Sequence, residues 1–362
     1  MRLLIVTFDP PQNIGGVEGR VRGYVSELTK RGEYVEIEAL SADYGFSREA
    51  FDGVRLTKSP SGARALPRSF PRTVRLISSG SIDSVFLLSG GITVFGNLLL
   101  LYCRLRGKRT AMLLYGKDIL QARKRTLGKV LLFGAQLLAG RVVTNSRFTQ
   151  SLLPSFFRPK MAILYPSVDP RSTTGEDRPR ERFTVLFVGR LVKRKGMDDL
   201  IEAFGALAPR FPPARLEIVG DGPERQGLEE LASRLGLRDR VTFYGSLRGE
   251  ALFRRYRECE VVAMPSRSMR DDVEGFGTVF LEAGLASKPS VGTFSGGIPE
   301  AIVDGETGIL VKEGDVRALA AALERLLGDR ELGRRLGENA RARVLAEFTW
   351  ERTSRHLVEI MS

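Results

Sequence analysis

Short apolar runs alternate with stretches of helical periodicity along the first half of the chain. The runs stand at residues 3–8, 35–40, 84–90, 110–115 and 141–146. Stretches with the apolar spacing of helices lie between several of them, for example at 17–30 and 118–139. Strands that alternate with helices form parallel β-α-β units, so this half predicts a doubly wound sheet.

A second series of the same kind follows a polar stretch at 168–182 that is rich in Pro, Gly and charge. Its apolar runs stand at 183–189, 215–221, 241–245, 261–266, 289–293 and 308–311. We therefore expect an α/β protein with two doubly wound, Rossmann-like domains at 1–167 and 183–345, joined by a linker at 168–182. The last residues, about 346–362, form a helix that can return to the first domain. Because ligands bind beyond the carboxyl ends of such strands, two sheets that face one another border one cleft.

Composition fits a globular protein with more than one core, since the chain has 362 residues and 43% of them are hydrophobic. The longest apolar stretch, 92–103, is too short to span a bilayer and is interrupted by Gly96 and Asn97. The N-terminus leads directly into a strand and lacks the layout of a signal peptide. Cys103 and Cys259 lie in apolar runs and offer no disulfide or metal framework. We expect a cytoplasmic protein.

The net charge of +13 is concentrated in one segment. Residues 55–129 hold fifteen Lys or Arg and two acids, Asp83 and Asp118, which gives 15 − 2 = +13. Such a local basic field predicts a polyanionic partner. Two stretches within and beside this segment, 68–80 and 121–138, mix basic with apolar residues. Such a mixture favours peripheral binding to an anionic membrane, and a basic face exposed to solvent is the alternative. The few aromatic residues do not interleave with the charges, which argues against nucleic acid.

Several glycine-containing turns suit phosphate. In residues 188–196, Gly189 permits a tight turn at the end of a strand. The planar guanidinium of Arg190 and the mobile ammonium of Lys195 suit the binding of a diphosphate. A solvated basic turn explains the same residues equally well. Gly15 and Gly16 stand where a helix begins and can bring N–H groups against an anion, although a flexible turn explains them equally.

No glycine pattern completes a dinucleotide fingerprint, and we expect no nicotinamide, flavin or other cofactor. Gly220 and Gly222 follow a strand, but Arg225 stands where the third glycine belongs. These glycines are better explained as turns that let the backbone approach a ligand or another loop.

The stretch at 274–284, EGFGTVFLEAG, places one carboxylate before a Gly-Phe-Gly turn and a second on the following helix. Glu282 lies one turn into a helix that starts near Thr278, so its side chain points back to the helix start. There its carboxylate can accept hydrogen bonds from a vicinal diol. The free N–H groups of Thr278 and Val279 can meet a phosphate. Glu274, in the turn, is freer to reach another part of the ligand. The alternative for Glu282 is an acid that stabilises the helix dipole.

These residues resemble the retaining glycosyltransferases of family 4, which have the GT-B fold. Gly189-Arg190-Leu191 with Lys195-Gly196 matches that family's diphosphate element. Glu274 and Glu282 match its E-x7-E motif, and 295–311 follows in the usual place. The resemblance covers nearly the whole chain and is specific mainly in the second domain.

The resemblance implies transfer of a hexose from a nucleotide-diphosphate sugar, with retention of configuration and without a metal. UDP is favoured by its frequency in the family, and GDP-mannose is possible. Arg190 and Lys195 hold the diphosphate and stabilise the leaving nucleotide, Glu282 binds the ribose, and Glu274 contacts the donor sugar. Other implied donor-binding positions are Gly15, Gly16, Gly189, Ser246, Leu247, Gly277, Thr278 and Val279, with the base near Ser246 and Leu247.

The chain departs from the family at 115–118, where the usual histidine is replaced by Tyr115. The only histidine, His356, lies near the C-terminus, so a histidine-dependent mechanism is excluded. Tyr115 or Asp118 lines the sugar pocket, unless Asp118 instead caps the following helix.

The acceptor has no motif of its own. With the basic segment, the resemblance favours a lipid-linked glycan or glycolipid at the inner face of the cell membrane. Two alternatives remain: a UDP-sugar 2-epimerase of similar architecture, and a basic binding protein that is not an enzyme.

Overall fold

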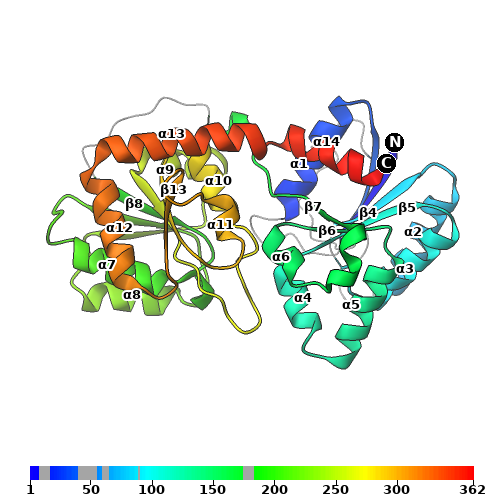
Figure 1. Ribbon diagram of the computed structural model, residues 1–362, viewed down its shortest axis with the longest axis horizontal. Helices are drawn as coiled ribbons and strands as arrows, with labels where there is room; N and C mark the ends of the chain where they lie inside the picture. The colour runs from blue at the N-terminus through cyan, green and yellow to red at the C-terminus, as the bar shows by residue number, and fades with distance from the viewer. Residues whose placement is uncertain (8–16, 40–54, 59–64, 89, 174–182) are drawn as a thin grey trace. The chain divides into compact units, whose positions relative to one another are not determined.

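The computed structural model describes residues 1–7, 17–39, 55–58, 65–88, 90–173 and 183–362 (Figure 1). It divides into two compact units. The first unit contains Met1–Ser167 and Trp350–Ser362, and the second contains Val168–Thr349. Each unit is built on one parallel sheet with helices against it, so the predicted class of two doubly wound α/β domains is confirmed. Of the predicted linker, residues 174–182 lie outside the described residues.

The first unit has a seven-stranded sheet with the order β3-β2-β1-β4-β5-β6-β7. Its strands are β1 (Arg2–Thr7), β2 (Tyr34–Ala39), β3 (Arg55–Lys58), β4 (Ser84–Leu87), β5 (Arg109–Leu114), β6 (Arg141–Thr144) and β7 (Met161–Ile163). Its helices are α1 (Val17–Lys30), α2 (Ala65–Ser78), α3 (Val94–Leu105), α4 (Gly116–Ala122), α5 (Thr126–Leu138), α6 (Arg147–Ser151), the 3-10 helix η2 (Ser155–Lys160) and α14 (Trp350–Met361).

Successive residues of the first sheet face two separate cores. On one side Leu3 and Ile5 pack with residues of α1 and α14; on the other, Leu4 and Val6 pack with residues of α3 and α5. Figure 1 shows α1 and α14 on one face of this sheet and α3 and α5 on the other. A Cβ at Gly23 of α1 would stand 2.2 Å from the Trp350 ring, so the absence of a side chain there lets α14 lie against α1.

The region predicted as one helical stretch at 118–139 is two helices, α4 and α5. The chain turns at 123–125, where the Lys124 and Arg125 amides donate to the carbonyls of Gln121 and Ala122. At the start of α5, a Cβ on Gly128 would stand 2.3 Å from the Ala122 carbonyl oxygen. The start of α5 can therefore lie close to the end of α4 because residue 128 has no side chain. The structure also adds the edge strands β3 and β7, which were not among the predicted apolar runs.

The second unit has a six-stranded sheet with the order β10-β9-β8-β11-β12-β13. Its strands are β8 (Thr184–Val188), β9 (Arg215–Val219), β10 (Val241–Gly245), β11 (Val261–Ala263), β12 (Ser290–Thr293) and β13 (Gly308–Val311). Its helices are α7 (Met197–Leu207), α8 (Arg225–Arg234), α9 (Gly249–Glu258), α10 (Thr278–Leu285), α11 (Ile298–Ala301), α12 (Val316–Gly328) and α13 (Arg330–Glu347), with the 3-10 helices η3 (Pro170–Thr173) and η4 (Lys193–Lys195).

All pairs in this sheet are parallel, so the carboxyl ends of its strands lie at one edge. The loops that follow β8, β9, β10 and β11 carry most of the residues singled out from the sequence. Among the described residues, no helix has the length and apolarity needed to cross a bilayer.

Candidate active site

The loops after β8 and β9 lie directly against one another. The Leu191 amide donates to the Asp221 carbonyl at 2.9 Å, and the Glu224 amide donates to the Leu191 carbonyl at 3.1 Å. A Cβ on Gly220 would stand 1.9 Å from the Gly189 carbonyl oxygen, and one on Gly222 would stand 2.3 Å from that of Leu191. These glycines therefore let one loop approach another, as the sequence indicated.

Glu274, after β11, accepts from two cations of the β8 loop. Its Oε2 lies 2.5 Å from Lys195 Nζ and 2.7 Å from Arg194 Nη1. Arg194 Nε also lies 3.2 Å from Asp272 Oδ2. The Lys195 and Glu274 side chains are only 12% and 13% exposed. Glu274 was expected to be freer than Glu282 to reach another part of the ligand, and in the structure its carboxylate is held by two cations.

This cluster fixes the charge of Glu274. Burial opposes ionisation of the carboxyl, but Lys195 and Arg194 outweigh burial and lower the pKa of Glu274 to about 2. Burial lowers the pKa of Lys195, and the Glu274 carboxylate opposes that effect. A largely buried anion thus lies against a largely buried ammonium at the sheet edge.

The Gly-Phe-Gly turn anchors the loop that carries Glu274. Phe276 is buried and its ring lies 5.5 Å from that of Phe348. Gly277 has a φ of 91° and precedes the first residue of α10, a conformation that favours glycine. The Gly297 amide donates to the Glu274 carbonyl at 2.9 Å, and a Cβ on Gly296 would stand 2.1 Å from that same oxygen.

Glu282 lies one turn into α10, which begins at Thr278 as predicted. The Tyr256 hydroxyl of α9 donates to Glu282 Oε2 at 2.5 Å, and Tyr256 is fully buried. Burial raises the pKa of Glu282, and the Tyr256 hydrogen bond opposes the shift. The second acid is thus held by a neutral donor, whereas the first is held by cations.

The other predicted positions of the second unit gather around the same strands. Leu247 and Val279 both pack against the apolar cluster that contains Val188 and Tyr256. Ser246 is exposed after β10, and Thr278 is partly exposed at the start of α10. Gly189 follows β8 and donates its amide to the Val219 carbonyl at 2.9 Å. Arg190 is exposed in the same turn and is not part of the Glu274 cluster.

The positions predicted in the first unit are only partly described. Gly15 and Gly16 lie outside the described residues. Tyr115 precedes α4, and its amide donates to Asp118 Oδ2 at 3.4 Å, so the capping alternative for Asp118 has a structural basis. The Arg20 guanidinium lies 5.1 Å above the Tyr115 ring. His356 is half exposed and pairs with Glu359 at 3.1 Å on α14.

The sequence interpretation missed Arg194 and Tyr256. Arg194 stands beside Lys195 and was counted as part of a solvated basic turn, although its side chain is only 14% exposed. Tyr256 contacts Glu282, which lies 26 residues further along the chain, so no local sequence pattern marks its role. The run of three cations before Gly196 was the one available signal for Arg194.

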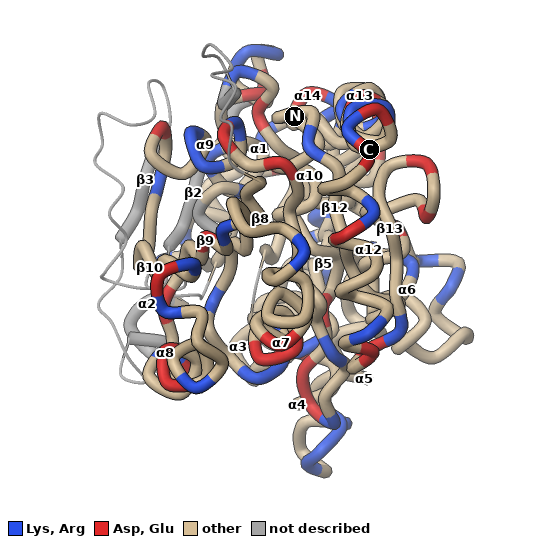
Figure 2. Tube along the Cα trace, turned by 90° about the vertical axis from the view of Figure 1, so that its left-hand side faces the viewer, with Lys and Arg blue, Asp and Glu red and all other residues tan. Residues whose placement is uncertain are grey.

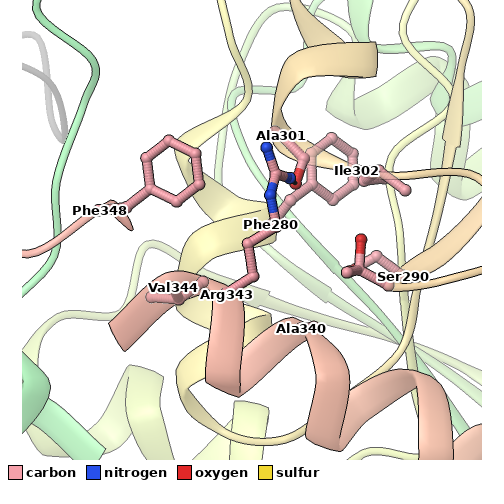
Figure 3. Close-up of a pocket in the computed structure, with 9 residues that line it drawn as sticks. Phe280, Ser290, Ala301, Ile302, Ala340, Arg343, Val344 and Phe348 are labelled. Atoms are coloured by element: carbon pink, nitrogen blue, oxygen red, sulfur yellow. Dashed lines mark hydrogen bonds between the residues drawn. The ribbon is translucent and has the colours of Figure 1, made fainter. Parts of the chain in front are cut away.

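A separate small hollow lies between α10, α11 and α13, lined by Phe280, Ile302 and Arg343 among others (Figure 3). Arg343 Nη1 and Nη2 donate to the carbonyls of Ala301 and Glu300 at 3.0 and 2.8 Å. Its guanidinium is thus used to hold the end of α11. The hollow is a packing feature, and the candidate site remains at the sheet edge.

Comparison with known proteins gives a consistent result. A family model described as "Glycosyl transferases group 1" matches residues 171–343. A GDP-mannose-dependent alpha-(1-6)-phosphatidylinositol monomannoside mannosyltransferase of Mycolicibacterium smegmatis is 32% identical, over 99% of this chain and 98% of that protein. The protein of the same description from Mycobacterium tuberculosis is 31% identical, over the same shares of both chains.

Among solved structures, Anabaena HepE in complex with UDP and glucose aligns with a TM-score of 0.79 and 21% identity, over 99% of this chain and 98% of that one. That similarity concerns the fold, which is GT-B. The predicted resemblance is therefore confirmed in its central point. This chain belongs to the group 1 glycosyl transferases.

Proposed function

We propose that this glycosyltransferase moves a hexose from a nucleotide-diphosphate sugar to a glycolipid, with retention of configuration and without a metal. The observation that carries the proposal is the contact of Glu274 with Lys195 and Arg194 at the carboxyl edge of the second sheet. A diphosphate is the ligand chemistry that competes with a carboxylate for such cations.

In the proposed reaction the donor diphosphate takes Lys195 from Glu274, and Arg190 binds further phosphate oxygens. Glu274, released in part from Lys195, accepts from hydroxyls of the donor sugar. The bond between the anomeric carbon and the phosphate oxygen breaks with its electron pair on the diphosphate. The acceptor hydroxyl attacks the same face, and its proton passes to the departing phosphate oxygen. Cations aimed at that oxygen accelerate such steps by about 10²–10³ each.

Glu282 binds the ribose in this proposal, while the amides of Thr278 and Val279 meet a phosphate. Gly277 and Gly189 keep the backbone close to the ligand, and the base lies near Ser246 and Leu247. From the first unit, Gly15 and Gly16 approach the phosphates, and Tyr115 or Asp118 borders the sugar. The hydrogen bond from Tyr256 to Glu282 supports the ribose role because it fixes one carboxylate oxygen.

The relatives favour a guanosine donor over the uridine donor preferred from sequence. Two mannosyltransferases similar over their whole length are described as GDP-mannose-dependent, and both act on a mannosylated phosphatidylinositol. We propose GDP-mannose and an inositol glycolipid of this class, used at the inner face of the cell membrane. Family membership favours a transferase over both the 2-epimerase and a non-enzymatic binding protein.

Calorimetry against GDP-mannose and UDP-glucose, followed by transfer to mannosylated phosphatidylinositol, tests donor and acceptor. The proposal expects tighter binding of GDP-mannose, an α-linked product by NMR and undiminished transfer in EDTA. If neither donor binds, the proposed site is rejected. Binding without transfer to any lipid would reject only the acceptor.

A further inference from the structure

Large apolar side chains reached by solvent are unevenly spread over the described residues. Of the fourteen that are well exposed, nine lie on α3, α5 and η2 of the first unit. These nine are Val94, Leu98, Leu101, Leu105, Leu127, Val130, Phe133, Leu137 and Phe156. The other five, in the second unit, are scattered over separate elements: Leu235, Tyr244, Met269, Phe294 and Leu345. We call the outer side of α3, α5 and η2 the α3–α5–η2 surface.

The exposed residues form one stripe on each helix. On α3 they recur at 94, 98, 101 and 105, opposite the buried Leu99, Leu100 and Cys103. On α5 they recur at 127, 130, 133 and 137, opposite the buried Leu132 and Ala135. Since the inner faces of both helices already pack on one core cluster, the stripes are additional apolar faces.

The two stripes belong to one continuous surface. Asn97 Nδ2 of α3 donates to the Leu131 carbonyl of α5 at 3.1 Å, which holds the helices side by side. Phe133 meets Phe157 edge to face at 5.6 Å, and Phe157 meets the 77% exposed Phe156 at 5.2 Å. These contacts extend the surface from α5 to η2.

Positive charge borders this surface. Residues 94–160 contain thirteen Lys or Arg and one acid, Asp118. Some of these cations bond backbone carbonyls: Arg104 Nη1 donates to Leu137 at 3.1 Å, and Lys160 Nζ donates to the same oxygen at 3.2 Å. Figure 2 shows the turn between α4 and α5, which holds Arg123, Lys124 and Arg125, in blue.

We infer that the α3–α5–η2 surface seats the first unit on an anionic lipid bilayer, with the apolar stripes in the headgroup boundary and the cations on lipid phosphates. A bilayer is the occupant that takes both components at once. A second copy of the chain would bring two like-charged surfaces together, and a nucleic acid would leave the aliphatic stripes in water. The inference rests on the proposed function for the presence of a glycolipid acceptor.

Flotation with vesicles of phosphatidylcholine alone, and of phosphatidylcholine with phosphatidylinositol, tests the inference. The wild-type chain binds the anionic vesicles more tightly, and salt weakens that binding. The combined variant Leu98→Gln, Leu105→Gln, Leu127→Gln and Val130→Gln loses at least about tenfold in vesicle affinity. All four side chains are at least 48% exposed, so the core of the unit is retained.

The matched control is Leu235→Gln with Leu345→Gln, two exposed leucines of the second unit. It keeps wild-type vesicle binding if the inference is right. Equal binding to neutral and anionic vesicles, or equal loss in both variants, overturns it. So does a wild-type dimer by light scattering that the stripe variant alone converts to monomer. GDP affinity, measured in parallel, reports the donor site: vesicle binding without GDP binding rejects the proposed function and leaves this inference standing.

Discussion

In the second unit the notable cations lie against carboxylates inside the protein, whereas in the first they border apolar side chains in water. Lys195 and Arg194 both contact one oxygen of Glu274, and their positions are fixed by it. Lys129 is exposed on α5 between two exposed apolar residues. Substituting either partner of a buried ion pair has a large effect, because the remaining charge is then buried without a partner of opposite sign. Exposed cations act together through solvent, so each contributes a small and salt-dependent part.

The largest effect is expected from Lys195→Ala, which removes a buried cation from Glu274 and from the proposed diphosphate. We expect kcat/KM to fall by about 10²–10³ in steady-state transfer assays. Lys193→Ala, two residues away and exposed, is the control and changes kcat/KM little. Equal losses in the two variants would mean that only the net charge of the loop matters.

The second effect concerns stability in acid. Because folding lowers the pKa of Glu274 from 4.5 to about 2, ionised Glu274 stabilises the fold above pH 4.5, and this contribution is lost as the pH falls toward 2. It amounts to on the order of 3 kcal/mol. Urea unfolding should show a shallower fall in the free energy of unfolding for Glu274→Gln than for wild type in this window. Glu202→Gln, an exposed acid of α7, should follow wild type; parallel slopes for all three would contradict the ion-pair account.

A smaller effect is expected from Tyr256→Phe, which removes the hydroxyl that holds Glu282. We expect nucleotide affinity to fall about tenfold, as for other hydrogen bonds to a charged group. Since this hydrogen bond opposes the raised pKa of Glu282, its loss should shift the acidic limb of nucleotide binding to higher pH. Tyr244→Phe removes a hydroxyl that donates to Glu217 at 3.2 Å and is the control. An unchanged pH profile would leave Tyr256 with a packing role only.

The smallest effect is expected from Lys129→Ala, which removes an exposed cation of the first unit. Vesicle affinity should fall about fivefold at low salt, and less at high salt, since one cation near an anionic surface contributes about 1 kcal/mol. Nucleotide affinity should stay unchanged. Lys312→Ala, exposed in the second unit, should alter neither quantity. A loss of nucleotide affinity in Lys129→Ala would break the division of labour between the two units.

The sequence was informative where local pattern decides the structure. The buried strands of both sheets stood out as apolar runs, and Gly277 with the apolar residues after it located the start of α10. It was less informative where contacts between distant residues decide. The short edge strands β3 and β7 lack long apolar runs, and the break before α5 depends on the close approach of Gly128 to Ala122. Arg194 and Tyr256 gain their roles from acids 80 and 26 residues away in the chain.

The first unit is built from both ends of the chain, since α14 packs on α1 with Leu357 and Met361 in the core and Trp350 against Gly23. During synthesis those residues leave the ribosome after the whole of the second unit. One face of the first sheet is therefore covered only in part, by α1, until α14 emerges, while the second unit, whose residues are contiguous, already has its complete sequence. A chain that stops short of Trp350 would leave part of that face exposed, and we expect it to aggregate or be degraded.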